Sequence, residues 1–557
     1  MKAFSLSLLV CLAVASRAQI APQAPRIVNV VNFIRLLEPR DSAITEDILF
    51  RTVQHQIALM RRYRLPGTFL LQYDALIDPR YQRLMKTLPR DSFEIGAWWE
   101  LPQPLVERAG LKWRGRYPWD WRANIGFSSG YTPEEREKLV DAYMQEFRRI
   151  FGYYPASVGS WFIDAHSLAY MSSKYHIVAS SNCKDQYGTD GYTLWGGYWN
   201  QAYYPSKDNS YMPAQDSAHQ IPVPIFRMLG SDPIRQYDNR LGSARQGVVT
   251  LEPVYRFGGG DSAWVHWFFN TFTSDPDLGF NYAQAGQENS FTWKAMARGL
   301  ELQFPLIAKL RAAGKLRVET LAASGRWFRS KYRLTPATSW TALKDIDGGD
   351  KRTVWYDSRY YRVNLLWENG NLRIRDIHLF DERFPSRYEQ TPATSDECRF
   401  FTLPVVDGYL WSKPGTKAGL RVKAVVDGKV VQVTGGEPAV LKAANSEMLI
   451  RWPLKTVAGN LEVHLQEDGL SIRLQSAQAL DWFLELNTAD SVSLPFQSIK
   501  PGLIVCKFED MRYQVRVEKG AAICPAHAAV LQIRPSDNAI ALGFRSHDRR
   551  QAAGAGH

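Results

Sequence analysis

The stretch ASVGSWFIDAHSLAYMSSKYHIVASSNCKDQYGTDGYTLWGGYWNQAYY, residues 156–204, decides the fold that the sequence predicts. It contains two apolar runs, at 157–165 and 177–183, followed by a loop rich in Trp, Tyr and Gly. Each run breaks into polar and ionisable side chains: Asp164, His166, Asn182, Lys184, Asp185 and Asp190. Apolar strands that end in acids, bases and aromatic rings are typical of a parallel (β/α) barrel, whose chemistry lies at the carboxyl ends of its strands.

The residues on either side of this stretch continue the alternation of strands and helices. We expect helices near 44–64, 132–151, 261–271 and 290–313, and strands at 26–35, 67–76, 93–100, 157–165, 177–183, 221–229, 247–255, 278–285 and 316–321. A closed barrel needs eight strands rather than nine, and the 221–229 candidate is the weakest because it has no helix on either side. The pattern predicts a (β/α)8-like TIM barrel over residues 19–335.

The pattern changes after about residue 335. Strand-like runs are joined by hairpin signals at WENGN (367–371), VVDGKV (425–430) and QEDGLS (466–471). Helical periodicity disappears, which indicates an antiparallel β-sandwich over 336–545. We expect the tail, 546–557, to be disordered. The fold class is therefore α/β followed by all-β.

The first 18 residues have the pattern of a secretory signal peptide. Lys2 precedes an apolar run too short to span a bilayer, and Ser16-Arg17-Ala18 is a small-x-small cleavage pattern. The alternative is a lipoprotein anchored at Cys11. Either interpretation predicts an exported protein, periplasmic or extracellular. We expect no later segment to cross a membrane.

Cysteine content and charge exclude some classes of protein. Export permits disulfides, and Cys506–Cys524 is the most favourable pair among the cysteines after the signal. The net charge of +12 comes from dispersed Lys and Arg interleaved with acids, without a nucleic-acid motif. We therefore expect a solvated basic surface and no nucleic-acid partner, with steering of an anionic substrate as the alternative. The oligomeric state stays open.

Polar residues at nearly every predicted strand end form the candidate site. The predicted acid–base centre is His166 supported by Asp164, and Asp190 or Glu252 would supply the base that activates water. The predicted substrate-binding residues are Arg35, Asp74, Trp99, Lys184, Tyr198, Arg227 and Glu288. Among these, the cationic side chains would hold an anionic group and the aromatic rings would form a sugar platform.

Several candidates also have a structural interpretation. Asp74 and Asp164 could cap the helices that follow them, and His166 could be a satisfied buried histidine. The charged residues at 35, 184 and 252 could instead take part in ion pairs. We predict no metal and no cofactor, because the histidines show no metal-ligand spacing.

Several motifs resemble a family of exported bacterial proteins long catalogued as domains of unknown function, with a β/α barrel followed by a β-sandwich. These motifs, within residues 26–415, are NFIRLLEPRD, PGTFLLQYDAL, GSWFIDAHSLAY, SSNCKDQYGTDGYTLWGGYWNQ, AQAGQENSF and VETLAASGRWF. The barrel also looks like the non-propeller, inverting sialidases. That resemblance implies an acid–base role for His166, whereas the aspartate of the first strand has no equivalent, since NFIR ends in Arg35.

The sequence therefore predicts an exported glycoside hydrolase that acts on a glycan, with an exo-α-sialidase as the most specific hypothesis. Two alternatives stay open. A metal-dependent polysaccharide deacetylase would need two histidines and an aspartate around a cation. A non-catalytic glycan-binding protein would need the aromatic rings but not the acids.

Overall fold

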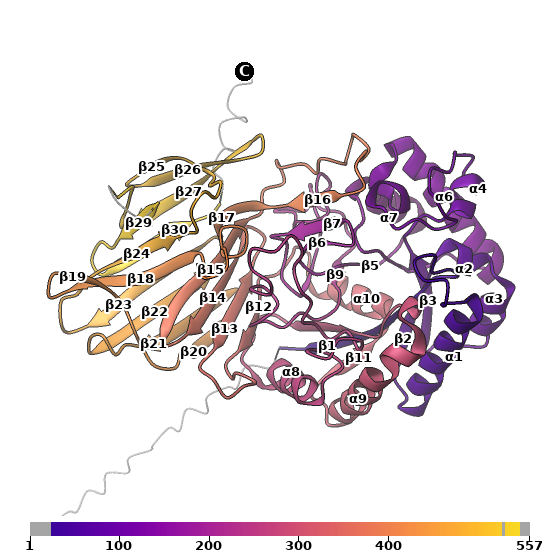
Figure 1. Ribbon diagram of the computed structural model, residues 1–557, viewed down its shortest axis with the longest axis horizontal. Coiled ribbons are helices and arrows are strands. Elements are labelled where there is room, and N and C mark those ends of the chain that lie inside the picture. Colours follow the sequence, from indigo (N-terminus) through magenta and orange to yellow (C-terminus); the bar gives the residue numbers. More distant parts are fainter. Residues whose placement is uncertain (1–23, 526–529, 546–557) are drawn as a thin grey trace, which may run out of the picture.

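The computed structural model describes residues 24–525 and 530–545 of the chain (Figure 1). The predicted signal peptide, 1–18, and the predicted tail, 546–557, lie outside the described residues. Across these described ranges, no helix has the length and apolar character needed to span a membrane.

A nearly closed, barrel-like sheet forms in the first part of the chain, and its strands are parallel except for β8, which is antiparallel to β9 (Figure 1). The hydrogen-bonded order is β10-β1-β2-β3-β4-β5-β9-β8, and β11 pairs with the first half of β1. The strands are β1 (Arg26–Ile34), β2 (Gly67–Leu71), β3 (Phe93–Trp98), β4 (Ser157–Gly159), β5 (Ala179–Asn182), β8 (Ala202–Tyr203), β9 (Ile225–Arg227), β10 (Asn281–Ala285) and β11 (Arg317–Glu319). All nine residues of β1 are buried, as expected for a parallel strand covered on both faces.

Helices cover the outside of this sheet, mostly between successive strands (Figure 1). They are α1 (Glu46–Arg62), α2 (Tyr73–Ile77), α3 (Pro79–Lys86), α4 (Gln103–Arg108), α5 (Ala123–Gly126), η1 (Ser128–Gly130), α6 (Pro133–Phe151), α7 (Ala165–Tyr175), α8 (Ser262–Ser274), η2 (Asn289–Phe291), α9 (Thr292–Ala312) and α10 (Leu321–Lys331). The predicted capping box of α6 is confirmed, with Thr132 as N-cap and Glu135 closing it. The helix ends at Gly152, whose φ of 82° is the left-handed conformation that glycine adopts freely.

The barrel departs from eightfold regularity at two places. First, β10 pairs directly with β1, so β11 lies beside the amino-terminal half of β1 rather than between the two. Second, the described part of the sheet has no ladder between β9 and β10. The side chain of Gln201 bridges that seam, donating to Asn281 Oδ1 at 2.8 Å and accepting from the Tyr282 amide at 2.9 Å.

The predicted strand at 247–255 is wrong, whereas the weaker candidate at 221–229 contains β9. A neighbouring loop supplies the hydrogen bonds that a strand would have made. Gln236 donates from Nε2 to the Gly247 carbonyl and accepts from the Val249 amide. Pro253 then removes a further amide donor from the segment.

Two predicted strands end earlier than expected, since helices begin inside them. Residues 73–77 of the second candidate form α2, and Asp164 in the fourth candidate is the N-cap of α7. The Asp164 carboxylate accepts a hydrogen bond from the Ser167 amide at 2.7 Å. The Asp164 cap therefore competes successfully with strand extension at α7, whereas α2 begins without a side-chain cap.

The rest of the chain forms two large antiparallel sheets beside the barrel (Figure 1). One contains β12 (Thr338–Ala342), β13 (Arg352–Asp357), β14 (Tyr361–Glu368), β15 (Asn371–Leu379), β17 (Leu403–Asp407), β18 (Gly419–Val426), β19 (Lys429–Gln432), β24 (Asp481–Asn487), β28 (Ala521–Ile523) and β29 (Leu531–Arg534). The other contains β20 (Ala439–Ala444), β21 (Glu447–Pro453), β22 (Gly459–Gln466), β23 (Gly469–Ser476), β25 (Phe496–Lys500), β26 (Leu503–Phe508), β27 (Met511–Lys519) and β30 (Ala539–Gly543). The three predicted hairpins are confirmed as β14–β15, β18–β19 and β22–β23.

A small third sheet ties the barrel to the antiparallel part. The hairpin β6 (Gln186–Thr189) and β7 (Tyr192–Trp195) pairs through β7 with β16 (Cys398–Phe401), which lies between the two parts in Figure 1. Buried polar contacts continue this connection. The Trp195 indole donates to Asp407 at 2.8 Å.

The predicted Cys506–Cys524 disulfide is wrong. All four described cysteines are free thiols. Cys506 is buried in β26 and lies opposite Tyr513 of β27, whereas Cys524 is exposed beyond the end of β28. The two side chains therefore belong to different sheets.

Candidate functional site

A cavity of about 370 Å³ lies at the carboxyl end of the barrel. The residues that line it follow β1, β4, β5, β9 and β10. The polar and aromatic ones are Glu38, Arg40, Asp41, Trp161, Lys184, Gln186, Thr189, Asp190, Tyr192, Glu252, Tyr255, Glu288, Ser290 and Phe291. A larger hollow of about 620 Å³ lies at the opposite end, against residues such as Leu65 and Phe93. In barrel enzymes the strand carboxyl ends carry the chemistry, so the smaller cavity is the candidate site.

A buried cluster of charges forms one wall of this cavity. Arg35, directly after β1, makes a two-pronged pair with Glu100 at 2.7 and 2.8 Å. Its third nitrogen lies 2.8 Å from Glu288 Oε2. Trp119 lies against the guanidinium, 4.2 Å from ring centroid to Cζ. The Arg35 cation is therefore shared between two carboxylates. Burial raises the pKa of Glu288 even though the Arg35 charge lowers it.

Glu252 lies on the other side of the cavity and has a different environment. Its carboxyl accepts hydrogen bonds from Thr250 Oγ1 at 2.8 Å and Gln287 Nε2 at 3.0 Å. Among the described residues, no cation lies within 4 Å of it. Burial raises the pKa of Glu252, and the negative charge of Asp190 adds to that rise. A raised pKa is the property that suits a carboxyl for the role of general acid.

Lys184 follows β5 and lines the same side of the cavity. Its ammonium donates to the Asp185 carbonyl at 3.1 Å and is almost fully buried. Burial lowers the pKa of Lys184, and the nearby Arg227 charge contributes to the decrease. The thiol of Cys183 is buried as well, which raises its pKa to about 12, so it is not a nucleophile.

Asp190 reaches the cavity from the tip of the β6–β7 hairpin. Asp190 and Gly191 have φ values of 53° and 79°, the left-handed pair that a two-residue type I′ turn requires. The turn places the exposed Asp190 carboxylate and the buried Tyr192 ring at the cavity edge. The Asp-Gly dipeptide explains why the hairpin forms at this position.

Five of the predicted site residues thus come together: Asp190, Lys184, Glu252 and Glu288 line the cavity, and Arg35 lies behind Glu288. Asp74 is close to them. It is buried beside Glu100, and burial raises its pKa to about 7. Its carboxylate accepts from the Ala75 amide at the start of α2.

The structure does not bring His166 into this group. It is the second residue of α7, and its ring contacts Glu137 of α6 at 3.0 Å on the outside of the barrel. There it lines a separate hollow of about 530 Å³. Asp164 is fully buried in an ion pair with Arg136 and caps α7. The helix begins before the end of the predicted strand, which turns both side chains away from the barrel mouth.

Three further predicted substrate-binding residues are buried in contacts with other parts of the protein and do not line the cavity: Trp99, Tyr198 and Arg227. Trp99 is buried against Tyr143 of α6 and donates to Ser128 Oγ. Tyr198 is buried and donates to the Pro336 carbonyl at 2.6 Å. The 195–204 loop is covered by the antiparallel sheet and therefore cannot serve as the expected sugar platform.

Arg227 is also held in a buried ion-pair network, which extends from the barrel to the antiparallel sheet. Arg227 pairs with Asp185 at 2.8 Å, and Asp185 also pairs with Arg362 of β14. Arg362 in turn pairs with Asp376 of β15 at 2.8 Å. The carboxylate of Asp185 is therefore neutralised from both parts of the chain.

The residues absent from the sequence-based site include Tyr255 and Trp161, which line the cavity, and Gln287, which holds Glu252 from behind. Gln287 belongs to the motif AQAGQENSF, next to the predicted Glu288, so its polarity was a usable signal. Tyr255 and Trp161 follow apolar runs without a distinguishing pattern. Only the folding of the loops after β4 and β9 brings these two to the cavity.

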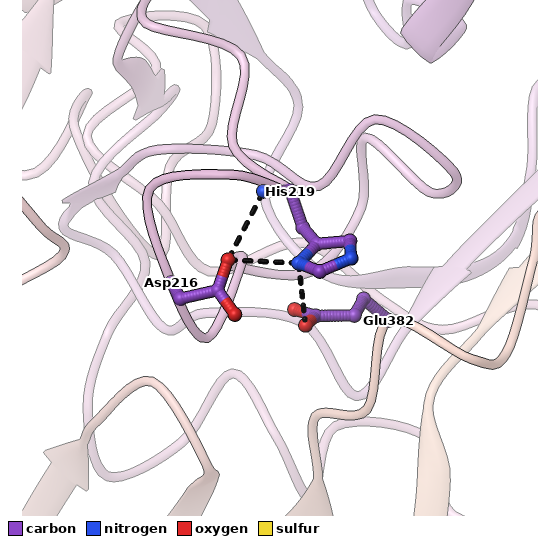
Figure 2. A group of neighbouring side chains, drawn as sticks. All are labelled: Asp216, His219 and Glu382. Carbon is purple, nitrogen blue, oxygen red and sulfur yellow. Dashed lines mark hydrogen bonds and ion pairs between the residues drawn. The ribbon is translucent and has the colours of Figure 1, made fainter. Parts of the chain in front are cut away.

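One group of described residues has donor atoms close enough to hold a metal ion, and it lies outside the cavity. Figure 2 shows His219 between Asp216 and Glu382, with His219 Nδ1 2.7 Å from Asp216 and 3.5 Å from Glu382. Asp216 also accepts from the amides of residues 218 and 219, which is typical of a loop-stabilising turn. With one histidine, this group does not match the two histidines and aspartate expected of a deacetylase.

Comparison with known proteins finds one family profile that matches part of the chain. The profile of a domain of unknown function with a solved structure, DUF3863, matches residues 121–299, which include β4 to β10. No curated protein matches the chain.

Solved structures with similar folds show low sequence identity. A candidate glycoside hydrolase/deacetylase from Parabacteroides distasonis is 15% identical, with a TM-score of 0.49, over 68% of this chain and 91% of that one. A candidate polysaccharide deacetylase from Mycobacterium smegmatis is 12% identical, with a TM-score of 0.36, over 56% and 93%. The 4-alpha-glucanotransferase from Thermococcus litoralis is 10% identical, with a TM-score of 0.32, over 94% and 100%. All three TM-scores lie below 0.5, so these similarities do not decide the function.

Proposed function

We propose that the protein is a glycoside hydrolase whose active site is the cavity at the barrel mouth. The observation that carries this proposal is the contrast between two carboxyl groups of that cavity. Glu252 is buried and burial raises its pKa even though the charge of Lys184 opposes that rise, whereas Asp190 is exposed at a hairpin tip. Carboxyl groups in two such environments can divide the acid and base roles of glycoside hydrolysis.

In this mechanism Glu252 donates its proton to the glycosidic oxygen as the bond to the anomeric carbon breaks. Gln287 and Thr250 hold the carboxyl in place through their hydrogen bonds. Asp190 removes a proton from the water that attacks the anomeric carbon. Aromatic residues of the cavity, Trp161 and Tyr255, cover the apolar face of the sugar.

The arginines argue against a sialic acid as the substrate. A sialidase needs cationic side chains that are free to hold the carboxylate of the sugar. Arg35 is shared between Glu100 and Glu288, Arg40 pairs with Glu38, and Arg227 pairs with Asp185. The arginines are therefore not available to a substrate carboxylate, which leaves Lys184 as the one cavity cation among the described residues without a carboxylate partner.

The test of Glu252 uses leaving groups of different acidity. Glu252→Gln keeps the side-chain shape but cannot donate the proton, so we expect kcat on an unactivated glycoside to fall about 10²–10⁴-fold. A nitrophenyl glycoside should lose much less, because its phenolate departs without protonation. A chromogenic panel that includes an α-sialoside first identifies the sugar.

Asp510→Asn, an exposed acid of the β26–β27 hairpin, is the matched control and should leave kcat unchanged. Circular dichroism checks that each variant is folded. Full turnover of the unactivated glycoside by folded Glu252→Gln protein would overturn the assignment. Cleavage of the α-sialoside alone would refute the argument from the arginines.

A further inference from the structure

The charge of the cavity is opposite in sign to that of the whole protein. The chain carries a net charge of +12. Four carboxylates besides the proton donor Glu252 line the cavity, at positions 38, 41, 190 and 288, against the two cations Arg40 and Lys184. Arg40 is neutralised by Glu38 at its side. A locally acidic cavity in a basic protein attracts cations and repels anions.

The excess of acid is greatest where the loops after β1 and β10 meet. These strands are neighbours, and the Arg35 amide donates to Asn289 Oδ1 at 2.9 Å, which joins the two loops. Asp41 accepts from the Ala43 amide through one oxygen, and no cation among the described residues lies within 4 Å of it. Glu288 shares Arg35 with Glu100, the Arg40 charge also acts on it, and its Oε1 accepts from Ser290 Oγ at 2.7 Å.

A buried acceptor atom in this region is also incompletely satisfied. Glu288 Oε2 lies 2.8 Å from Arg35 Nη1, yet the direction of that contact forms no hydrogen bond, and no other described group donates to the atom. Aromatic residues complete the surroundings, with Phe291 beside Glu288 in the chain and Tyr255 on the facing loop. Carboxylates combined with aromatic rings are the usual environment of a bound ammonium group.

We propose that the terminal sugar bound in this cavity carries a free, protonated amino group, held between Asp41 and Glu288. This inference rests on the proposed function and specifies its substrate class. The amine lies on the β1–β10 side, whereas Glu252, Asp190 and Lys184 lie on the β5–β9 side, so the amine does not compete with the proton donor. N-acetylation would remove the positive charge and leave Asp41 without a countercharge and Glu288 with Arg35 alone.

The test compares the binding of small sugars by calorimetry. Glucosamine and galactosamine are each measured against their N-acetyl forms, the parent hexoses and the corresponding uronic acids. One of the amino sugars should bind with a Kd about tenfold below that of its neutral counterparts, as a charge-assisted hydrogen bond requires. Raising the salt concentration should weaken only that binding, and uronic acids should bind worst.

Asp41→Asn should weaken binding of the amino sugar about tenfold and leave neutral sugars unaffected, whereas the Asp510→Asn control should change neither. Equal binding of amino and neutral sugars, tighter binding of a uronic acid, or no binding of any sugar would overturn the inference. Turnover is measured separately. If one of these results came with cleavage of a neutral glycoside, the inference would fail and the proposed function would stand. If an amino sugar bound selectively but no glycoside were cleaved, the inference would stand and the proposed function would fail.

Discussion

At the scale of single residues, Arg35 determines the shape and charge of the cavity wall. Its guanidinium is almost fully buried, with Glu100 and Glu288 as ion-pair partners and Trp119 packed against its face. A buried ion pair adds little net stability over an apolar replacement of the whole group. Removal of one member is costly, however, because the others remain charged without water or a partner.

We therefore expect Arg35→Met to lower the free energy of unfolding by about 3–5 kcal/mol, measured by urea denaturation followed by fluorescence. Arg51→Met is the matched control, since Arg51 and Asp47 form an exposed pair on α1 that contributes less than about 1 kcal/mol. Adding Glu100→Gln and Glu288→Gln to Arg35→Met should recover part of the loss. A cost as small as that of Arg51→Met would show that the two glutamates are already neutral.

At the scale of elements, the first turn of α7 is hydrogen-bonded to a residue more than 200 positions later in the chain. Glu389, between β15 and β16, accepts from the amides of His166 at 2.6 Å and Ala165 at 3.3 Å. Asp164 caps the same helix turn, and Arg136 lies against both segments. Burial and the Asp164 charge raise the pKa of Glu389 to about 8.

This pKa makes the stability of the fold depend on pH. The folded protein keeps the Glu389 proton up to about pH 8, whereas the unfolded chain releases it near pH 4.5. Stability therefore falls as the pH rises through this window. Asp74, with a pKa of about 7, acts in the same direction at lower pH.

Thermal unfolding at several pH values measures this dependence. We expect the unaltered protein to lose on the order of 4 kcal/mol between pH 5 and pH 9 through Glu389. Glu389→Gln cannot ionise and should flatten the decrease, most clearly between pH 7 and pH 8, where Asp74 is already ionised. An identical pH profile for this variant and for Asp510→Asn would contradict the assignment.

At the scale of the whole molecule, the barrel and the antiparallel sheets share buried groups. Trp199 of the barrel part stacks on Trp355 of β13 at 3.8 Å, with the rings nearly parallel. Asp185 has one arginine partner from each part, Arg227 and Arg362. The hairpin that carries Asp190 pairs with β16. The candidate site therefore depends on the antiparallel part for its position.

A chain that ends at residue 335 tests this dependence. It would expose the face of Trp199 and leave Asp185 without Arg362, so we expect it to aggregate or to lack a cooperative thermal transition. The full-length protein, prepared in parallel, should show a sharp transition. A truncated protein that unfolds cooperatively within a few degrees of the full chain would show that residues 19–335 form an independent domain, as the sequence predicts.

How much could be predicted from the sequence differs between elements and site. The capping box at Thr132, the Asp-Gly turn at 190–191 and the three later hairpins were predictable, because each depends on the backbone preferences of adjacent residues. The absence of a strand at 247–255 was not predictable, because the side chain of Gln236, in a neighbouring loop, takes the hydrogen bonds of this segment. His166 was misplaced relative to the barrel mouth because Asp164 begins a helix where a strand was expected.

The sequence by itself determined the alternation of apolar strands with capped helices, the change to hairpins after residue 335, and the presence of acids after β9 and β10. These are local properties, set by periodicity and turn chemistry. Only the tertiary structure decided which acids share a cavity, because Glu252 and Asp190 come from loops that are distant in the chain. It also decided that the arginines are neutralised, since an ion pair depends on distances that no local pattern contains.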